Sequence, residues 1–433
     1  MKQRVIQTEE VRLDRIVGEG RAIATMADGR KLFVWGGLPG ELVEVEINKK
    51  RSSYAEGVVT KVTEASPERV APKDPGSFLS TSPWQILSLE DENRYKIQLI
   101  DEAFAMHHFA LPASSEMYSD GVEYGYRNKV EFSFWWNREE RSLSLAFFKR
   151  GSHQKIEVDG TSLASDAINE AAARMIDILH SRRHLNGMEL KTFLVRSSRD
   201  GKVSGQLYVK SLEFAHFSPE ELEALAIDGF ELIYSNPKSP ASVITERLQA
   251  HGELALTDTI LDVPFRYATE GFFQINLPVY EEALRDMQKA IPANTPVVDL
   301  YSGVGTIGLT IGGDNVTLVE VNEHAVREMR QNIEALGKKG ATAVLAPSEA
   351  ALEYITADAT VIVDPPRAGL HADVTDRLLE VLPERIIYLS CNPATQARDV
   401  ALLSAKYAVR AHRGYNFFPH TPHIEHLVVL DKA

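Results

Sequence analysis

Four largely apolar runs in the last third of the chain, each followed by polar residues or glycine, constrain the fold more than any other feature. They are Val297–Leu300, Val316–Val319, Val361–Val363 and Ile386–Leu389. Short apolar runs of this kind are typical of strands buried in a parallel sheet. Asn322–Leu336 lies between two of them and has the apolar spacing of an amphipathic helix, as an alternating sheet requires. The sequence therefore predicts an α/β domain over residues 266–433.

The first of these runs leads into a glycine turn. Val297–Gly308 is a strand that continues into a helix, and Gly303 and Gly305 let the backbone approach a ligand closely. Glu320 ends the next strand about 20 residues further on, where a carboxylate can bind both hydroxyls of a ribose. This pair fits either a dinucleotide or S-adenosylmethionine. The acid Asp299 inside the strand, without a Gly-x-Gly-x-x-Gly pattern, favours S-adenosylmethionine.

The only cysteine of the chain, Cys391, stands at the end of the last run and is followed by Asn392 and Pro393. Catalytic groups of a parallel sheet lie just beyond the carboxyl ends of its strands. A cysteine chosen at random is most often a small buried apolar residue. Its place at a strand end, before a turn-forming Asn-Pro pair, favours a nucleophile instead.

Asp364 ends the third run and is followed by two prolines. These can stiffen the loop so that it aims a carboxylate or a backbone carbonyl into the cleft. On its own, a Pro-Pro pair is most often only a loop stiffener.

Three histidines near the carboxyl end suggest a zinc site as an alternative. His420, His423 and His426 stand beside Glu425, but the apolar strand Leu427–Leu430 follows directly. Zinc ligands of this kind usually lie on a helix or hairpin with fixed spacing. We therefore expect a catalytic loop here and no metal site.

Residues 1–64 are predicted to form short strands separated by glycine turns, at Val11–Val17, Ala22–Ala24, Lys31–Val34, Glu41–Ile47 and Gly57–Val62. Five short strands in so few residues suggest a small closed, OB-like barrel. The basic run Lys49–Arg51, followed by Tyr54, is equally consistent with a solvated hairpin tip and with an RNA contact. The pattern resembles the TRAM domain, a barrel attached to RNA-modifying enzymes, and Leu38–Glu41 is its most recognisable piece.

Residues 65–265 are predicted to form a linker and a central α+β region. Residues 65–76 are Pro-rich and polar, and a helix is expected between Leu87 and Phe109. Cations stand beside aromatics at Tyr126–Lys129 and Lys149–Arg150, a composition that can hold phosphates and stack bases. Solvated strand ends are the alternative. Further elements are expected at Val130–Trp136, Leu143–Phe148, Ala167–Arg182, Leu190–Val195 and Val203–Val209.

The succession of motifs in the last third resembles the RNA 5-methyluridine methyltransferases, which are S-adenosylmethionine-dependent enzymes with a Rossmann-like catalytic domain. The matching pieces are Phe272–Asn276, Asp299–Gly303, Asp364–Gly369, Ser390–Pro393 and Phe418–Glu425. They stand in the order that the family has, and the N-terminal barrel extends the match. The resemblance implies methylation of carbon 5 of a uridine in structured RNA.

The chemistry explains why a thiol is needed. Carbon 5 of uracil is too weak a nucleophile to take a methyl group directly, but a thiolate that adds to carbon 6 converts the ring to an enolate. By resemblance Cys391 is this nucleophile, and Glu425 is the base that removes the proton from carbon 5.

The resemblance also implies the cofactor site. The matching positions are Gln274, Tyr301, Thr306, Glu320 and Asp364. The target base must be flipped out of its stack into the pocket, and Phe272 and Phe273 are candidates to line it.

Two departures from the family stand out. Several members hold an iron–sulfur cluster with four cysteines, whereas the corresponding stretches here, Ser80–Gln85 and the region near Thr161, contain none. Because the ligands must be thiolates, no such cluster is expected, and packing is expected to replace its role in folding. The second departure is Asn416, where members often have Asp, and its consequence is open.

The totals limit the partners. A net charge of −14 counts against broad non-specific nucleic-acid binding but leaves room for a local basic groove. No apolar run is long enough to span a membrane, the N-terminus has no secretory signal, and one free thiol suits the cytoplasm. We expect an RNA partner and infer no obligate protein partner. By resemblance alone, the attached barrel favours ribosomal over transfer RNA.

Three alternatives stay open at this point. In the first, the substrate is a uridine of transfer RNA. In the second, the enzyme methylates an exocyclic amine through the Asp364-Pro-Pro loop, a reaction that leaves Cys391 and Glu425 without a role. A non-enzymatic alternative is an RNA-binding module with a vestigial cofactor site.

Overall fold

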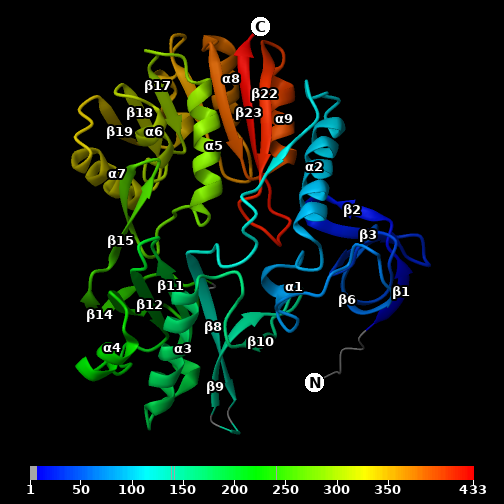
Figure 1. Cartoon of the computed structure of the whole chain (residues 1–433), viewed down its shortest axis with the longest axis vertical. Helices are drawn as coiled ribbons and strands as arrows, with labels where there is room; N and C mark the ends of the chain where they lie inside the picture. Colours follow the sequence, from blue (N-terminus) through cyan, green and yellow to red (C-terminus); the bar gives the residue numbers. More distant parts are fainter. Residues whose placement is uncertain (1–6, 138, 141, 240) are drawn as a thin grey trace.

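The computed structural model describes residues 7–137, 139–140, 142–239 and 241–433. Within them, three large sheets and one hairpin follow one another along the chain: a curled sheet near the N-terminus, a central sheet, and a sheet that the chain from residue 297 onward builds almost alone (Figure 1). No helix in these described ranges is long and apolar enough to cross a membrane.

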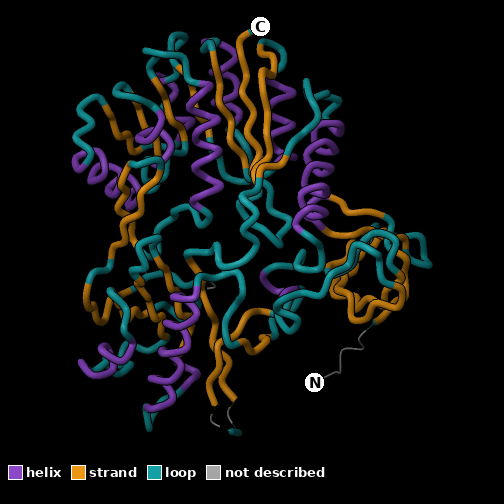
Figure 2. Tube along the Cα trace, in the orientation of Figure 1, coloured by secondary structure: helices purple, strands orange, loops and turns teal. Residues whose placement is uncertain are grey.

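The N-terminal sheet curls into a barrel (Figure 2). Its strands are β1 (Thr8–Arg12), β2 (Arg15–Val17), β3 (Arg21–Thr25), β4 (Lys31–Trp35), β5 (Leu42–Lys50) and β6 (Tyr54–Glu64), in the order β1-β5-β6-β4-β3-β2. The predicted strand over Val11–Val17 is in fact two strands. The chain changes partner between them, since the backbone N–H of Leu13 bonds to Glu41 and that of Asp14 bonds to Ile23.

The barrel leads through an irregular segment and the short α1 (Phe78–Thr81) into α2 (Leu89–Met106). Ser88 caps this helix, because its hydroxyl accepts the backbone N–H of Asp91 (3.1 Å). The prediction of a helix between Leu87 and Phe109 is confirmed. α2 packs on α9 (Pro393–Leu403) of the catalytic half.

The central sheet has the order β10-β9-β8-β11-β12-β13-β14. Its strands are β8 (Lys129–Asn137), β9 (Ser142–Phe148), β10 (Lys155–Val158), β11 (Leu190–Ser197), β12 (Val203–Val209), β13 (Gly229–Tyr234) and β14 (Glu246–Gly252). The helices α3 (Asp166–Ser181) and α4 (Pro219–Leu225) lie beside it (Figure 1). β14 was not predicted, since this strand is largely exposed and its sequence lacks the alternation of a half-buried strand.

A hairpin of β15 (Ala255–Ile260) and β16 (Val263–Ala268) joins the central sheet to the last one. The last sheet has the order β19-β18-β17-β20-β21-β23-β22-β7. Its strands are β7 (Met117–Tyr118), β17 (Val297–Leu300), β18 (Val316–Glu320), β19 (Ala341–Leu345), β20 (Thr360–Val363), β21 (Arg385–Ser390), β22 (Tyr407–Tyr415) and β23 (Glu425–Lys432). The helices of this half are α5 (Leu277–Ala290), α6 (Thr306–Ile311), α7 (Glu323–Ala335), α8 (Ala372–Val381) and α9. The α/β fold predicted from the four apolar runs is confirmed.

The order of the parallel strands positions the site. The chain moves outward from β17 through β18 to β19, and then returns to the other side of β17 with β20 and β21. At such a switch point the loops after neighbouring strands part, and a ligand cleft opens at the carboxyl ends.

Candidate active site

A single cavity of about 1520 Å³ lies at the carboxyl ends of these strands. Seven residues predicted from the sequence as catalytic or cofactor-binding line it: Gln274, Tyr301, Thr306, Glu320, Asp364, Cys391 and Glu425. They come from six different loops or strand ends, separated by up to 151 positions along the sequence. The fold thus brings together every residue of the predicted site.

The glycine turn after β17 leaves space for a ligand. Gly303 has φ +58°, and a Cβ atom added there would meet nothing within 4 Å. Its backbone N–H donates to Glu320 Oε2 (2.9 Å), while Glu320 Oε1 accepts the N–H of Asn322 (2.8 Å). Two backbone amides therefore hold this carboxylate at the edge of the cavity.

Behind the turn, Asp299 is fully buried. Its Oδ2 accepts the backbone N–H of Gly308 at the start of α6 (2.9 Å), and its Oδ1 has no hydrogen-bond partner among the described residues. Burial raises the pKa of Asp299 to about 8. This carboxyl group fixes the turn and does not line the cavity.

Cys391 and Glu425 lie at adjoining ends of neighbouring strands. β21 and β23 are antiparallel, and their last pair is Ser390 opposite His426, so Cys391 and Glu425 are the residues that adjoin this end of the ladder, and both line the cavity. Asn392 caps α9 by accepting the N–H of Ala394 (3.2 Å), and its Nδ2 donates to Arg367 O (2.8 Å). The Cys-Asn-Pro motif is thus a tight strand-to-helix turn that leaves the thiol half-exposed in the cavity.

The electrostatics of this pair follow from burial. Burial and, to a smaller extent, the carboxylates of Glu425 and Asp364 raise the pKa of the Cys391 thiol to about 11, against the opposite effect of Arg367. Burial also raises the pKa values of Glu425 and Asp364, and the charge of Asp364 adds to the shift at Glu425. The cavity therefore holds closely spaced acidic groups that resist ionisation together.

Arg367 and His423 form a pair that was not predicted as part of the site. Arg367 Nη2 donates to His423 Nδ1 (3.0 Å), and both side chains line the cavity. Burial and the charge of Arg367 lower the pKa of His423 to about 4, so the ring is neutral and accepts this hydrogen bond. Both residues stand inside the quoted motifs, but only the fold brings the motifs together.

The segment around Phe272 is held by buried cations. Arg196, only 1% exposed, donates to the carbonyl oxygens of Gly271 (2.8 Å) and Phe273 (3.1 Å). Phe273 is buried and stacks on Tyr267, with 3.9 Å between ring centroids, whereas Phe272 is 73% exposed at the cavity. Of the two predicted pocket residues, only Phe272 presents its ring to solvent.

Most of the polar and basic side chains that were predicted as RNA contacts form hydrogen bonds or ion pairs within the protein. Asn128 Nδ2 donates to Gln274 O (3.0 Å), and Lys129 Nζ donates to Glu270 O (2.9 Å). Arg150 donates to Leu79 O and covers Trp35 of the barrel. In the basic run Lys49–Arg51, Lys49 pairs with Glu56 (2.7 Å).

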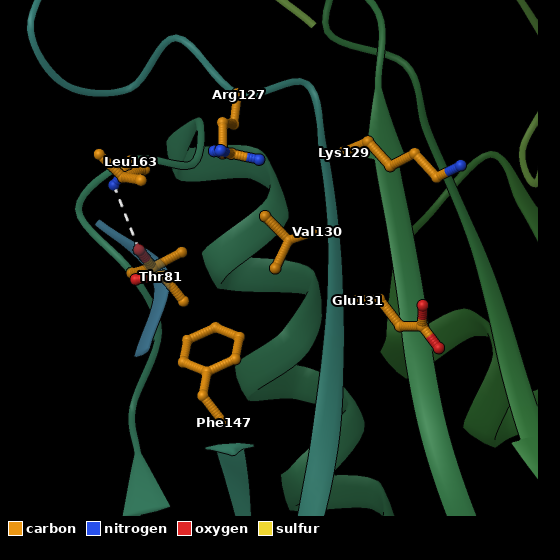
Figure 3. A pocket seen from close by; sticks show the side chains of 8 residues that line it. Thr81, Arg127, Lys129, Val130, Glu131, Phe147 and Leu163 are labelled. Carbon is orange, nitrogen blue, oxygen red and sulfur yellow. Dashed lines mark hydrogen bonds between the residues drawn. The ribbon is translucent and has the colours of Figure 1, made fainter. Parts of the chain in front are cut away.

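Arg127 is different, because it lines both the large cavity and a second one of about 250 Å³. Figure 3 shows Arg127 above Val130, Phe147 and Thr81, while Lys129 and Glu131 extend from the opposite side of the strand. Arg127 Nε is buried without a hydrogen-bond partner in the described part of the chain.

The two stretches that match the cluster cysteines of relatives do meet. Gln85 Nε2 donates to Asp74 Oδ2 (3.0 Å), and Ser162 Oγ donates to the same oxygen (2.7 Å). Thr81 and Thr161 line the small cavity. Hydrogen bonds centred on Asp74 therefore join the two stretches beside a cavity, and the replacement of the cluster's folding role by packing stays a prediction.

The three histidines do not form a metal site. His420 lies within 3.2 Å of Glu123, and His426 Nδ1 lies 2.7 Å from Gln396 Oε1 in the interior of the sheet. Among the described residues no group of three or more His, Cys, Asp or Glu could hold a metal ion. Glu425 and His426 begin β23, so the expected catalytic loop ends one residue before Glu425.

A cavity with a carboxylate at the end of β18 held by a glycine turn, and a thiol after β21 on the other side of β17, is typical of S-adenosylmethionine-dependent methyltransferases. A family model described as tRNA (Uracil-5-)-methyltransferase matches residues 91–344 and 348–433, and a TRAM domain model matches residues 2–60. The chain therefore belongs to the tRNA (uracil-5-)-methyltransferase family and is an RNA methyltransferase.

Similar proteins agree with this assignment. A protein of Enterococcus faecalis named as an uncharacterized RNA methyltransferase is 31% identical over 98% of this chain and 97% of its own length. One of Bacteroides thetaiotaomicron with the same description is 28% identical over 96% and 100%. The solved structure of Pyrococcus abyssi tRNA (uracil-54, C5)-methyltransferase with S-adenosyl-L-homocysteine has a TM-score of 0.78 at 22% identity, covering 98% of this chain and all of its own. This last similarity is one of fold.

The residues present fit the cofactor. S-adenosylmethionine carries a ribose and a positively charged sulfonium. Glu320 offers a fixed carboxylate for ribose hydroxyls, Gly303 leaves open space, and Asp364 adds negative charge to the same cavity.

Proposed function

We propose that this protein methylates carbon 5 of a uridine in structured RNA through a covalent bond between Cys391 and carbon 6 of the uracil. The observation that carries this proposal is the position of the only thiol and of Glu425 at adjoining strand ends, at the edge of a cavity that also holds the cofactor-type residues. Methylation of an exocyclic amine would need neither side chain.

The protein's own groups have distinct roles in this proposal. The Cys391 thiol gives up its proton to water, and the thiolate, which the nearby charge of Arg367 favours, bonds to carbon 6 and converts the ring to an enolate. When bound, S-adenosylmethionine supplies an electrophilic methyl group, which carbon 5 takes. Glu425 then takes the proton from carbon 5, the double bond between carbons 5 and 6 re-forms, and the bond to sulfur breaks with its electron pair returning to Cys391 as the thiolate. Burial makes Glu425 a stronger base than an exposed carboxylate.

For the cofactor we propose Gln274, Tyr301, Glu320 and Asp364 as contacts, with Thr306 in a supporting place. Thr306 Oγ1 lies 2.9 Å from the Tyr280 hydroxyl, so part of its hydrogen-bonding capacity is used within the protein. Phe272 is the proposed stacking partner of a base at the entrance.

The RNA class is open between ribosomal and transfer RNA. The barrel favoured ribosomal RNA in the sequence, but the Pyrococcus enzyme is named for transfer RNA and its similarity covers 98% of this chain. The barrel alone therefore does not discriminate between the two substrates.

One assay tests the reaction and the substrate together. Ribosomal and transfer RNA from a strain that lacks the gene are incubated with the protein and methyl-labelled S-adenosylmethionine, then digested to nucleosides. We expect label in 5-methyluridine from one fraction, and none with Cys391→Ala. Glu425→Gln is expected to accumulate a protein–RNA adduct on denaturing gels. Full turnover by Cys391→Ala would refute the covalent route, and label in an N-methylated base would support the amine reaction.

A further inference from the structure

The irregular segment Asn416–Ile424 carries cavity-lining side chains up to the start of β23. Phe418 and His423 line the cavity, and Glu425 follows directly. A segment without ladder hydrogen bonds depends on contacts from other elements for its conformation. Most of these contacts come from α2, more than 300 positions earlier in the sequence.

Two charged residues one turn apart on α2 face this segment. Glu92 and Lys96 are both fully buried, and Lys96 Nζ lies 2.7 Å from Glu92 Oε1. Lys96 Nζ also donates to Asn416 Oδ1 (2.6 Å) and to Phe418 O (3.2 Å). The ammonium group thus has three acceptors, which uses all of its protons.

The carboxylate is equally well satisfied. Glu92 Oε1 accepts from Asn416 Nδ2 (2.9 Å), and Glu92 Oε2 accepts the backbone N–H of His420 (2.7 Å). Asn416 Nδ2 donates to Asn93 Oδ1 as well (2.8 Å). Because every polar atom of the pair bonds to the segment or within the pair, few other conformations of the segment would leave both charges satisfied.

Asn416 has to be an amide in this setting. Its oxygen accepts from a cation and its nitrogen donates to a carboxylate, a combination that an ionised Asp does not offer. An Asp here would place a second carboxylate against Glu92. The departure from the Asp of other members therefore goes together with Glu92 in this chain.

We propose that Glu92, Lys96 and Asn416 are positioning residues for methyl transfer: they fix the segment Asn416–Ile424 so that Phe418 and Glu425 face the substrate. The inference rests on the proposed function. Its alkylation test, in contrast, needs neither RNA nor methyl transfer. None of the three residues lines the cavity, and Lys96 reaches a cavity-lining residue only at the backbone oxygen of Phe418, so their effect passes through the segment.

The first test is Asn416→Asp, assayed with saturating RNA and S-adenosylmethionine. We expect kcat to fall tenfold or more while the Kd for S-adenosylmethionine changes less than twofold, because Glu320 and Gly303 lie on other loops. The loss should grow as pH rises, since two facing carboxylates share a proton only at low pH. The other ionisable groups that face this cluster are Lys96, Tyr124, Tyr126, His420 and Glu123. Burial lowers the pKa values of Lys96 and His420 and raises those of the two tyrosines.

The matched variants separate positioning from folding. Adding Glu92→Gln to Asn416→Asp restores one negative and one positive charge, and should recover at least threefold in kcat. Glu102→Gln, on the same helix but paired with Arg15 of the barrel, should leave kcat unchanged. Wild-type kcat in Asn416→Asp at high pH, or an equal loss in Glu102→Gln, would overturn the proposal.

The last test does not need RNA. If Glu425 moves away, the Cys391 thiol loses a neighbour that raises its pKa, and alkylation by iodoacetamide at pH 8 should accelerate in Asn416→Asp but not in Glu102→Gln. An unchanged alkylation rate would count against displacement of Glu425. If alkylation accelerates in Asn416→Asp as expected but the wild-type protein methylates no RNA, the positioning of Glu425 would stand and only the proposed function would be contradicted.

Discussion

Cys391 offers the most direct measurement at the scale of single residues, because any thiol reagent reports on it alone. Burial and two nearby carboxylates raise its pKa to about 11. We predict that the rate of alkylation by iodoacetamide rises about tenfold per pH unit up to this value, whereas an exposed cysteine levels off near its ordinary pKa of about 8.5.

Two variants give the signs of the neighbouring charges. Glu425→Gln removes a negative charge and should shift the alkylation profile to lower pH. Arg367→Met removes the positive charge and should shift the profile to higher pH. If neither substitution shifts the pH dependence of the alkylation rate, these groups do not act on the thiol.

Phe272 supports a second prediction at this scale. Its ring is 73% exposed at a cavity that the exposed side chains of Val243 and Val321 also line, so the entrance presents several apolar groups to a partner. Stacking of a base on an aromatic ring contributes about 1–3 kcal/mol, so Phe272→Ala should raise the KM for RNA about 5- to 150-fold and leave S-adenosylmethionine binding unchanged.

The matching controls are Phe272→Tyr, which keeps the ring, and Val321→Ala, which trims another exposed apolar side chain of the same cavity. Both should stay close to the wild-type KM. A similar rise in all three variants would indicate a general disturbance of the entrance.

At the scale of elements, the barrel touches the segment that precedes Glu425. Trp84 Nε1 donates to Gly20 O (2.9 Å), and the Trp84 backbone N–H donates to His420 O (3.1 Å). A Cβ atom on Gly20 would lie 2.0 Å from Pro422 Cβ, so the barrel and the segment fit only because Gly20 has no side chain.

We therefore predict that Gly20→Ala lowers kcat severalfold, although the residue lies in the barrel. Gly29→Ala is its control, because Gly29 also has a positive φ but a Cβ atom there would meet nothing within 4 Å. Both variants carry backbone strain of about 1–2 kcal/mol, which thermal unfolding should register. Equal kcat in the two variants would show that the clash with Pro422 does not reach the active site.

Helices and strands with a clear apolar pattern could be predicted from the sequence. The strands β17, β18, β20 and β21 were expected because each is a compact apolar run, and the helix α7 because its apolar residues recur at helical spacing, whereas the largely half-buried or exposed β19 was not predicted. The site followed because Cys391, Asp364 and Glu320 each stand at a strand end, where topology brings them together. The pairing of Arg367 with His423 and the role of Arg196 were missed. Both depend on which acceptor groups the fold brings to the guanidinium group, and the sequence does not show these positions.

On the scale of the whole molecule, buried carboxyl groups should set the pH dependence of stability. Burial raises the pKa of Asp299 to about 8, so between pH 4 and 8 the folded protein holds a proton that the unfolded chain releases. Stability therefore falls as pH rises through this window. Asp299→Asn keeps an acceptor for the Gly308 N–H and should remove this part of the fall.

The measurement is the difference in melting temperature between Asp299→Asn and the wild type, which should increase from pH 5 to pH 8. Asp364 and Glu425 are present in both proteins, so the comparison cancels most of their contribution. A difference that stays constant with pH would mean that Asp299 is ionised in the folded protein.

The molecule is less divided than the sequence suggested. Domain limits at residues 64 and 265 remain a prediction, but the buried side chains of the barrel, α2 and one face of the last sheet form a single apolar cluster. Charge and composition do not predict such a common core. It forms because apolar surfaces of the barrel, α2 and the last sheet pack together, and none of these surfaces has an unusual composition by itself.

The place of β23 has a consequence for the way the protein is made. Residues 425–432 lie between β21 and β22, although both neighbours are synthesised first. During translation, at about 5–20 residues per second, β21, which directly precedes Cys391, has an open edge until β23 emerges and inserts. The thiol and Glu425 therefore meet only in the last stage of synthesis, and a nascent chain that is stalled before residue 425 carries the nucleophile without its base.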